Sequence, residues 1–346
     1  MSEVQPPSQR SGLWLVGVLA AVGIAGVFLG HTLPPSQDQS STGSTRPVVQ
    51  ITRQPGLPSL SDVVSRLCPS MSKVVPTTQT ASASGIGSPA FAVSTDGWLV
   101  ASAPLPHNVR LQALFGDGQE SPIDEIRTDP VSGIVIAHAQ RSGLAPMAFA
   151  DQFFAHVGDF GFSLAVGSGT GCAAQASMVG SDFLVDGLAQ GVYIRLQPGL
   201  TPLPAGSPFF AADGSVIGVA TGTGDNSLLP APIASTVVNE LIRNSPSPIA
   251  AFGFRAIDFT ADLAVRIGDA RARGAGVALV QPKSAAESAG LRAGDIVLAV
   301  DQSPVSSASE LSRALDAVVT SATLQVERGG NRMSVIVTRA TGKAAA

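Results

Sequence analysis

The chain contains few groups that could carry out acid–base or nucleophilic chemistry. A serine attacks only when an imidazole within hydrogen-bond reach takes its proton and a carboxylate holds that imidazole in place. The residues that could form such a group on loops are His107, Asp124 or Asp129, and Ser207. No Cys/His spacing is typical of a metal site, and the histidines are scattered as His31, His107, His138 and His156. We therefore expect no metal and no cofactor.

Ser207 lies in a loop that leads into a predicted β-hairpin. Residues 203–208 read Leu-Pro-Ala-Gly-Ser-Pro, and the density of proline and glycine favours a loop. Two phenylalanines, at 209 and 210, then precede a turn ending in Asp213 and Gly214. The β-branched run 216–219 follows the turn, which is the pattern of a hairpin.

Short apolar strands separated by turn residues dominate the chain from residue 60 to residue 244. Helices are predicted only at its two ends, over residues 60–67 and 235–243. Many strands at close spacing indicate a β-sandwich or a β-barrel. The pattern alone does not choose between the two. The predicted strands are residues 91–93, 98–101, 109–115, 134–138 and 160–166.

Several runs in this region resemble the trypsin-like HtrA (Deg) proteases. Residues 96–103 (Asp-Gly-Trp-Leu-Val-Ala-Ser-Ala) are similar to the segment that precedes the catalytic histidine of that family. Residues 128–134 (Thr-Asp-Pro-Val-Ser-Gly-Ile) are similar to the segment that holds its aspartate, and residues 200–220 to its nucleophile loop. Residues 157–167 and 230–233 match further strand segments. The resemblance implies a mostly β fold with a double β-barrel over residues 61–246.

The positions at which the family keeps its catalytic triad are occupied by other residues here. The resemblance places the histidine at Pro104, the aspartate at Gly133 and the serine at Ala205. None of these side chains can act as nucleophile, base or orienting carboxylate. The family's oxyanion hole uses a glycine where this chain has Leu203, followed by Pro204, and leucine resists the backbone dihedrals that glycine tolerates. We therefore expect no catalytic residues, with the displaced group around Ser207 as the alternative.

Residues 250–340 resemble a bacterial PDZ domain, an α+β fold that binds peptides. The run Phe252, Gly253 and Phe254 corresponds to the loop that binds a peptide's terminal carboxylate, and residues 284–297 to the most distinctive segment of the domain. The strand after the loop would pair with the peptide by β-augmentation. Leu311, on a helix predicted within residues 305–318, borders the side-chain pocket or belongs to the core. The resemblance implies that C-terminal or unfolded polypeptide segments are the ligands.

The N-terminal segments predict a tethered protein. Residues 1–11 form a short cytoplasmic end, and residues 12–32 are long and apolar enough for one transmembrane helix. A cleaved signal peptide is the alternative. Residues 33–60 are rich in Pro, Ser, Thr and Gln, which predicts a disordered linker. The globular part is then extracytoplasmic, on the inner membrane. In that oxidising compartment, Cys68 and Cys172 either form a disulfide or are two buried free thiols.

The composition and the architecture together define the expected function. Charged residues make up 13% of the chain and its net charge is −4 without a basic cluster, so nucleic acid is excluded as a partner. The architecture resembles that of DegS-type envelope stress sensors, which implies a homotrimer or an assembly with an active HtrA relative. We expect a membrane-anchored pseudoprotease that acts as scaffold or regulator. The alternatives are an active endopeptidase with a displaced triad and a PDZ adaptor whose barrel is a spacer.

Overall fold

A computed structural model describes residues 59–78, 87–102, 104–106, 108–151, 155–167, 170–186, 191–197, 201–260 and 274–340. The predicted transmembrane helix at residues 12–32 and nearly all of the predicted linker lie outside these ranges. Within the described ranges, no helix has both the length and the apolar character needed to cross a bilayer. The residues from Pro55 onward form one compact unit.

The first half of the predicted protease-like region is a closed six-stranded barrel. Its strands hydrogen-bond in the order β1-β2-β3-β6-β5-β4, and β1 closes the ring by pairing with β4. Inward-facing residues such as Leu99, Phe115 and Val135 form its core. The strands are β1 (Met71–Pro76), β2 (Ser88–Ala92), β3 (Trp98–Ser102), β4 (Leu111–Phe115), β5 (Glu120–Thr128) and β6 (Ile134–Ala139).

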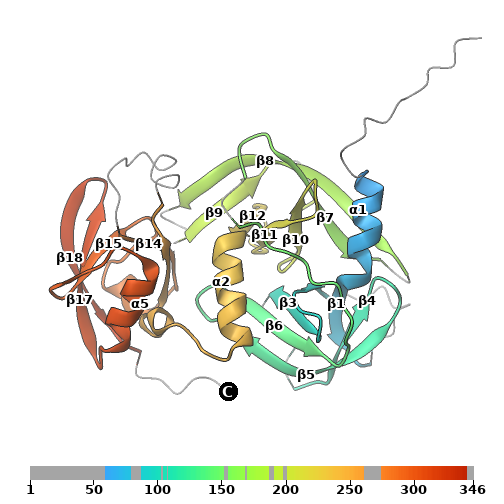
Figure 1. Ribbon diagram of the computed structural model, residues 1–346, viewed down its shortest axis with the longest axis horizontal. Coiled ribbons are helices and arrows are strands. Elements are labelled where there is room, and N and C mark those ends of the chain that lie inside the picture. The colour runs from blue at the N-terminus through green and yellow to red at the C-terminus, as the bar shows by residue number, and fades with distance from the viewer. Residues whose placement is uncertain are drawn as a thin grey trace, which may run out of the picture. The chain divides into compact units, whose positions relative to one another are not determined.

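A second six-stranded barrel follows (Figure 1). Its strands run in the order β12-β11-β10-β7-β8-β9, and the pairing of β12 with β9 closes the ring. The mostly β, trypsin-like double barrel predicted from the sequence is confirmed. The strands are β7 (Phe160–Val166), β8 (Cys172–Asp186), β9 (Gly191–Leu196), β10 (Pro208–Ala211), β11 (Val216–Ala220) and β12 (Ser227–Pro230).

The hairpin of β10 and β11 forms around the predicted turn. The side chain of Asp213 accepts hydrogen bonds from the backbone N–H and the hydroxyl of Ser215, both at 2.8 Å. Gly214 has a φ of 91°, in the left-handed region that favours glycine. A Cβ on Gly214 would also lie 2.9 Å from Val63 of α1 (Leu60–Leu67), so this helix packs closely on the turn.

A disulfide between Cys68 and Cys172 joins the two barrels. Cys68 begins the short 3-10 helix η1 (Cys68–Ser70), whereas Cys172 begins β8 of the second barrel. Gly116 lies against the bond, because a Cβ there would come within 2.6 Å of Cys68 Sγ and 2.9 Å of Cys172 Sγ. Of the two alternatives left open by the sequence, the structure has the disulfide.

Helix α2 (Ala231–Ile242) ends the second barrel. It begins earlier than the helix predicted at residues 235–243, because Pro232 lies in its first turn, where a missing N–H costs no hydrogen bond. Its buried residues, including Ile233 and Val237, pack into the barrel core.

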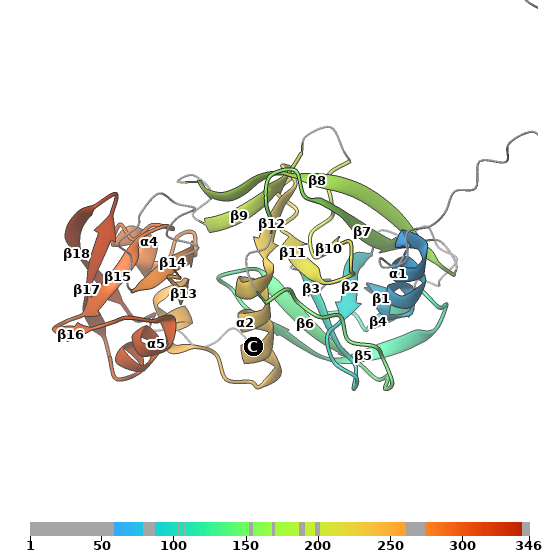
Figure 2. The same ribbon diagram turned by 45° about the horizontal axis from the view of Figure 1, so that its top comes forward.

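The C-terminal domain has its own core and the predicted α+β composition (Figure 2). Strands β14, β15, β17 and β18 follow one another in its sheet; β13 pairs with β14, and β16 with β15. The elements are η2 (Pro248–Phe252), β13 (Phe254–Asp258), β14 (Ala275–Val280), α4 (Ala285–Ser288), β15 (Ile296–Val300), β16 (Ser303–Pro304), α5 (Ala308–Asp316), β17 (Ser321–Arg328) and β18 (Asn331–Thr338).

Candidate functional site

The loops that carry the three triad-equivalent positions converge on one place. Gly133 lies just before β6 and its carbonyl oxygen accepts a hydrogen bond from Ser102 Oγ of β3 at 3.3 Å. Gly206 of the loop before β10 approaches the same residue, because a Cβ on Gly206 would lie 2.8 Å from the Ser102 backbone nitrogen. Pro104 follows Ser102 after β3, and Ala205 precedes Gly206. The fold thus brings together the segments that carry the three predicted triad positions, and the residues at those positions, Pro104, Gly133 and Ala205, carry no hydroxyl, imidazole or carboxylate.

The oxyanion-loop residues are engaged in other contacts. Leu203 is buried in the core of the second barrel, and its backbone N–H donates to Asn226 Oδ1 at 3.1 Å. Pro204 has no N–H to donate. Its carbonyl oxygen accepts the Ser207 backbone N–H at 3.1 Å. An oxyanion needs convergent free N–H donors. Leu203 and Pro204 offer none.

The described residues of the displaced group are buried or engaged in other contacts. Ser207 is only 2% exposed, within the turn that leads into β10. Asp129 and Asp124 are both occupied elsewhere: Asp129 accepts hydrogen bonds from Ser132 and Arg255, and Asp124 contacts His138. The remaining member, His107, lies outside the described residues.

His138 and Asp124 form a histidine–carboxylate pair on the surface of the first barrel. The Nδ1 of His138 lies 2.7 Å from Asp124 Oδ1, and its Nε2 lies 3.0 Å from the carbonyl oxygen of Asp96. This hydrogen bond from His138 lowers the pKa of Asp124. Because both ring nitrogens of His138 face these acceptors, neither nitrogen is directed at a serine. Among the described residues, no group of three His, Cys, Asp or Glu side chains could hold a metal ion.

The predicted carboxylate loop is a rigid turn at the start of β13. Phe252 and Phe254 are both fully buried, and Gly253 between them has a φ of 85°. The backbone of Gly253 donates to Ala250 at 2.9 Å and accepts from Gln281 at 2.8 Å. A Cβ on Gly253 would lie 2.4 Å from the Cβ of Ser284, so only glycine fits this turn.

A groove follows the free edge of β13. Among the described strands, β13 pairs only with β14, which leaves its other edge available to an added strand. The groove has a volume of about 740 Å³. It is lined by side chains of β13, α5 and α2, including Ala256, Asp258, Ser309, Ser312, Thr236 and Glu240.

Leu311 lies in the core of the C-terminal domain and is fully buried, so it does not line this groove. The neighbouring Ser309 and Ser312 of α5 line it instead. Helical spacing could have indicated them, since they fall beside the apolar face formed by Leu311 and Leu315.

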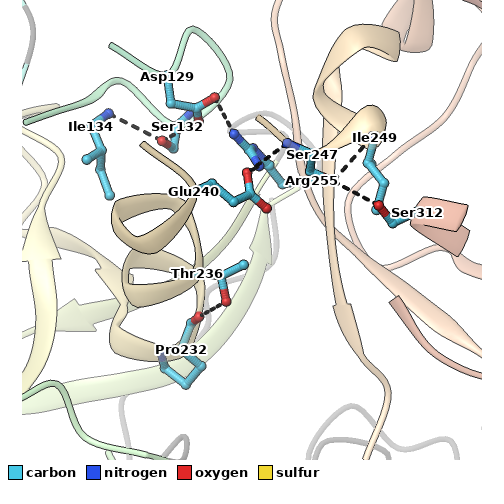
Figure 3. A network of polar contacts seen from close by, with 10 residues as sticks. All are labelled: Asp129, Ser132, Ile134, Pro232, Thr236, Glu240, Ser247, Ile249, Arg255 and Ser312. Carbon is cyan, nitrogen blue, oxygen red and sulfur yellow. Dashed lines mark hydrogen bonds and ion pairs between the residues drawn. The ribbon is translucent and has the colours of Figure 1, made fainter. Parts of the chain in front are cut away.

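The buried side chain of Arg255 joins β13 to the first barrel and to α2 (Figure 3). One guanidinium nitrogen lies 2.6 Å from Asp129 Oδ1, and another contacts Glu240 Oε2. Burial by itself would lower the pKa of Arg255, but the two carboxylates raise it above its ordinary value. No sequence pattern pointed to this residue, because its partners are far away along the chain.

Comparison with known proteins is consistent with both parts of this description. Residues 276–328 match the family model of the PDZ domain. A probable periplasmic serine protease do/HhoA-like of Haemophilus influenzae is 26% identical over 240 residues, 66% of this chain and 52% of the relative. The periplasmic pH-dependent serine endoprotease DegQ of Escherichia coli is 25% identical over 241 residues, again 66% and 52%. The chain thus spans about half the length of these curated relatives.

Solved structures show the same fold. A variant of the HtrA-type protease AlgW with a decapeptide matches at a TM-score of 0.50 and 19% identity, over 83% of this chain and 99% of that chain. The double six-stranded barrel followed by a PDZ domain defines the class of trypsin-like, PDZ-carrying chains. In sequence, the chain is similar to HtrA/DegP-like serine proteases at 25–26% identity.

Proposed function

We propose that the chain is a catalytically inactive HtrA-like protein that binds polypeptide segments through its PDZ domain. The proposal is carried by the convergence of the segments of Pro104, Gly133 and Ala205, at which the resemblance places the family's triad. These residues supply no group that activates or performs a nucleophilic attack. The Leu203 N–H donates to Asn226 and is not free to bind an oxyanion, which supports the proposed lack of catalysis.

Peptide binding is the function that the C-terminal domain retains. The turn at Gly253, the free edge of β13 and the adjoining groove are the parts that β-augmentation requires. The AlgW structure that shares this fold contains a decapeptide. We infer that apolar C-termini, or exposed segments of unfolded chains, are the ligands here.

The proposed setting is the cell envelope, where the protein acts as scaffold or regulator in protein quality control. Both curated relatives carry "periplasmic" in their names. The apolar run at residues 12–32 supports a single membrane anchor with the globular part outside the cytoplasm. A homotrimer, or an assembly with an active relative, completes the proposal. Light scattering that shows a monomer would count against the homotrimer.

Proteolysis and peptide binding can be measured on the same protein. The full chain in a mild non-ionic detergent is incubated with casein and, separately, with a serine-directed fluorophosphonate probe, with and without an apolar C-terminal peptide. DegQ serves as the active control. We expect no cleavage and no labelling by the chain, together with peptide binding in fluorescence anisotropy.

Two variants separate the rival functions. The Ala205→Ser variant should remain inactive, because Pro104 and Gly133 still provide no base and no carboxylate. If the unaltered chain cleaves casein and Ser207→Ala abolishes the cleavage, the protein is an endopeptidase with a displaced triad. If the ligand peptide fails to bind at all, the peptide-binding function is wrong.

A further inference from the structure

The groove beside β13 is built by two domains. One side is β13 and α5 of the PDZ domain, and the other is α2, the closing helix of the second barrel. Thr236 and Glu240 of α2 line the same space as Ser309 and Ser312 of α5. A peptide added to β13 would therefore contact α2 as well as its own domain.

Carboxylates outnumber cations along this groove. Among the residues that the structure describes, the charged lining residues are Asp151, Glu240, Asp258 and Arg255. The only cation among them, Arg255, already contacts both Glu240 and the buried Asp129. The positive charge of Arg255 is therefore more than balanced, and the carboxylates of Asp151 and Asp258 give the described lining of the groove a net negative charge.

Two further cations on described elements packed around the groove do not line it. Arg127, on β5 beside α2, contacts Glu125 and donates to the carbonyl oxygens of Leu241 and Ile242. Arg313, on α5, interacts with Glu310 of the same helix. Neither residue belongs to the groove lining, so neither compensates its carboxylates directly.

The direction of a bound peptide places its upstream residues near these carboxylates. A terminal carboxylate at the predicted loop of residues 252–254 puts the last residue beside Phe254, so the preceding residues run along β13 toward Asp258. At about 3.3 Å per residue, the side chain three to four positions before the C-terminus lies near Asp258. The hydrogen bond from the Ala308 N–H to Asp258 Oδ1, at 2.7 Å, holds this carboxylate between β13 and α5.

A second, independent feature also indicates a polypeptide ligand. Arg255 is 5% exposed and lines the groove, yet its Nε has no hydrogen-bond partner among the described residues. A buried donor without an acceptor costs free energy, so it is normally satisfied by a ligand or by water. A carbonyl oxygen of a bound peptide backbone is an acceptor of the right kind.

We propose that this two-domain groove selects polypeptides that carry basic residues three to four positions before an apolar C-terminus. The acidic residues Asp151 and Asp258 set this preference, and α2 contributes to it. The inference rests on the proposed peptide-binding function and adds the chemical class of the ligand.

Three fluorescently labelled peptides of about ten residues test the proposal on the full chain. They share the same apolar C-terminal residues and carry two lysines, two serines or two glutamates at the upstream positions. At low ionic strength the lysine peptide should bind about five- to tenfold more tightly than the serine peptide, and the glutamate peptide more weakly than either. The differences should shrink in about 0.5 M salt, because mobile ions screen exposed charges.

A double substitution identifies the residues responsible. In Asp151→Asn with Asp258→Asn, the amide oxygen still accepts from Ala308 while both charges are lost. The affinity for the serine peptide should stay the same, and the preference for lysine should fall at least threefold. Asp316→Asn, at the far end of α5 and outside the groove, removes one charge and should leave the preference unchanged.

The outcomes separate this inference from the function on which it rests. If the serine peptide binds but lysine gives no advantage, or the double variant keeps the full advantage, the charge preference is wrong and peptide binding stands. If none of the three peptides binds, the peptide-binding function itself fails, and the preference fails with it.

Discussion

Arg255 and Asp129 form an ion pair, with 2.6 Å between Arg255 Nη2 and Asp129 Oδ1, and their side chains are only 6% and 1% exposed. Arg255 lies on the strand to which a peptide would add, whereas Asp129 lies on the turn that ends at Gly133. The other carboxylate oxygen of Asp129 accepts from the backbone N–H and hydroxyl of Ser132, at 2.8 and 2.5 Å. One carboxylate thus orders the turn that ends at Gly133 and holds the edge strand of the PDZ domain.

Removing Arg255 should destabilise the protein strongly. In Arg255→Ala, Asp129 would remain buried without its cation, which costs about 3–5 kcal/mol in comparable pairs. Urea denaturation followed by circular dichroism measures the loss. Arg332→Ala is the control, because the Arg332 side chain is 76% exposed and its pair with Glu327 contributes about 0–1 kcal/mol. Equal effects of the two substitutions would contradict a buried ion pair.

The Cys68–Cys172 bond should account for all sensitivity of the stability to reducing agents. The bond closes a separation of 104 residues, and loss of a native disulfide typically costs about 2–5 kcal/mol. Dithiothreitol should therefore lower the urea midpoint of the unaltered chain. The Cys68→Ser and Cys172→Ser double variant should already have the lower midpoint and should not respond, since the chain has only these two cysteines. A response of the double variant would show another cause.

Gly253→Ala should abolish peptide binding. An added Cβ would lie 2.4 Å from the Ser284 Cβ, and alanine is strained at a φ of 85°. The dissociation constant of an apolar C-terminal peptide should rise more than tenfold in fluorescence anisotropy. Gly290→Ala is a matched control, because Gly290 has a φ of 84° and no atom within 4 Å of an added Cβ. That variant should lose about 1–2 kcal/mol of stability and keep its affinity.

The ionised carboxylate of Asp225 should stabilise the turn near Ala205, and this stabilisation should be lost at strongly acidic pH. Burial raises the pKa of Asp225, but hydrogen bonds from Thr223 and Ser227 outweigh it and lower the pKa from 3.8 to about 2. Because the folded pKa is below the unfolded one, the stabilisation is present above pH 3.8 and is lost as the pH falls toward 2. Because the Asp225 side chain is 41% exposed, this stabilisation amounts to about 1 kcal/mol.

The Asp225→Asn variant isolates this contribution from those of other carboxylates. It should be less stable than the unaltered chain at pH about 7 and should approach it in stability at pH about 2.5. Urea midpoints at several pH values measure the difference. A constant difference across this range would mean that the ionisation of Asp225 contributes nothing.

Local signals in the sequence were sufficient for most elements of the fold. The hairpin at Asp213 and Gly214 was predictable because its turn chemistry lies within a few residues. Helix α1 was predictable for a similar reason, with Asp62 in its first turn and apolar Val63 and Leu67 on one face. The start of α2 was missed because Pro232 resembles a helix stop while it occupies the first turn.

Contacts between distant segments could not be predicted. Nothing near Cys68 in the sequence identifies Cys172 as its partner, since only the closure of two barrels brings them together. The bond between Arg255 and Asp129 likewise depends on where the two domains meet. For Leu311, apolar spacing gave the face of the helix but not which neighbours it touches, so the lining by Ser309 and Ser312 required the structure.

The position of α2 affects how the ligands of this protein can be identified. A PDZ domain excised at residue 250 would lack Thr236 and Glu240, and its groove would be open to solvent on that side. Peptides selected on such a fragment would be chosen by an incomplete surface. Peptide libraries therefore need to be screened against the intact chain, because α2 and the C-terminal domain line the proposed groove together.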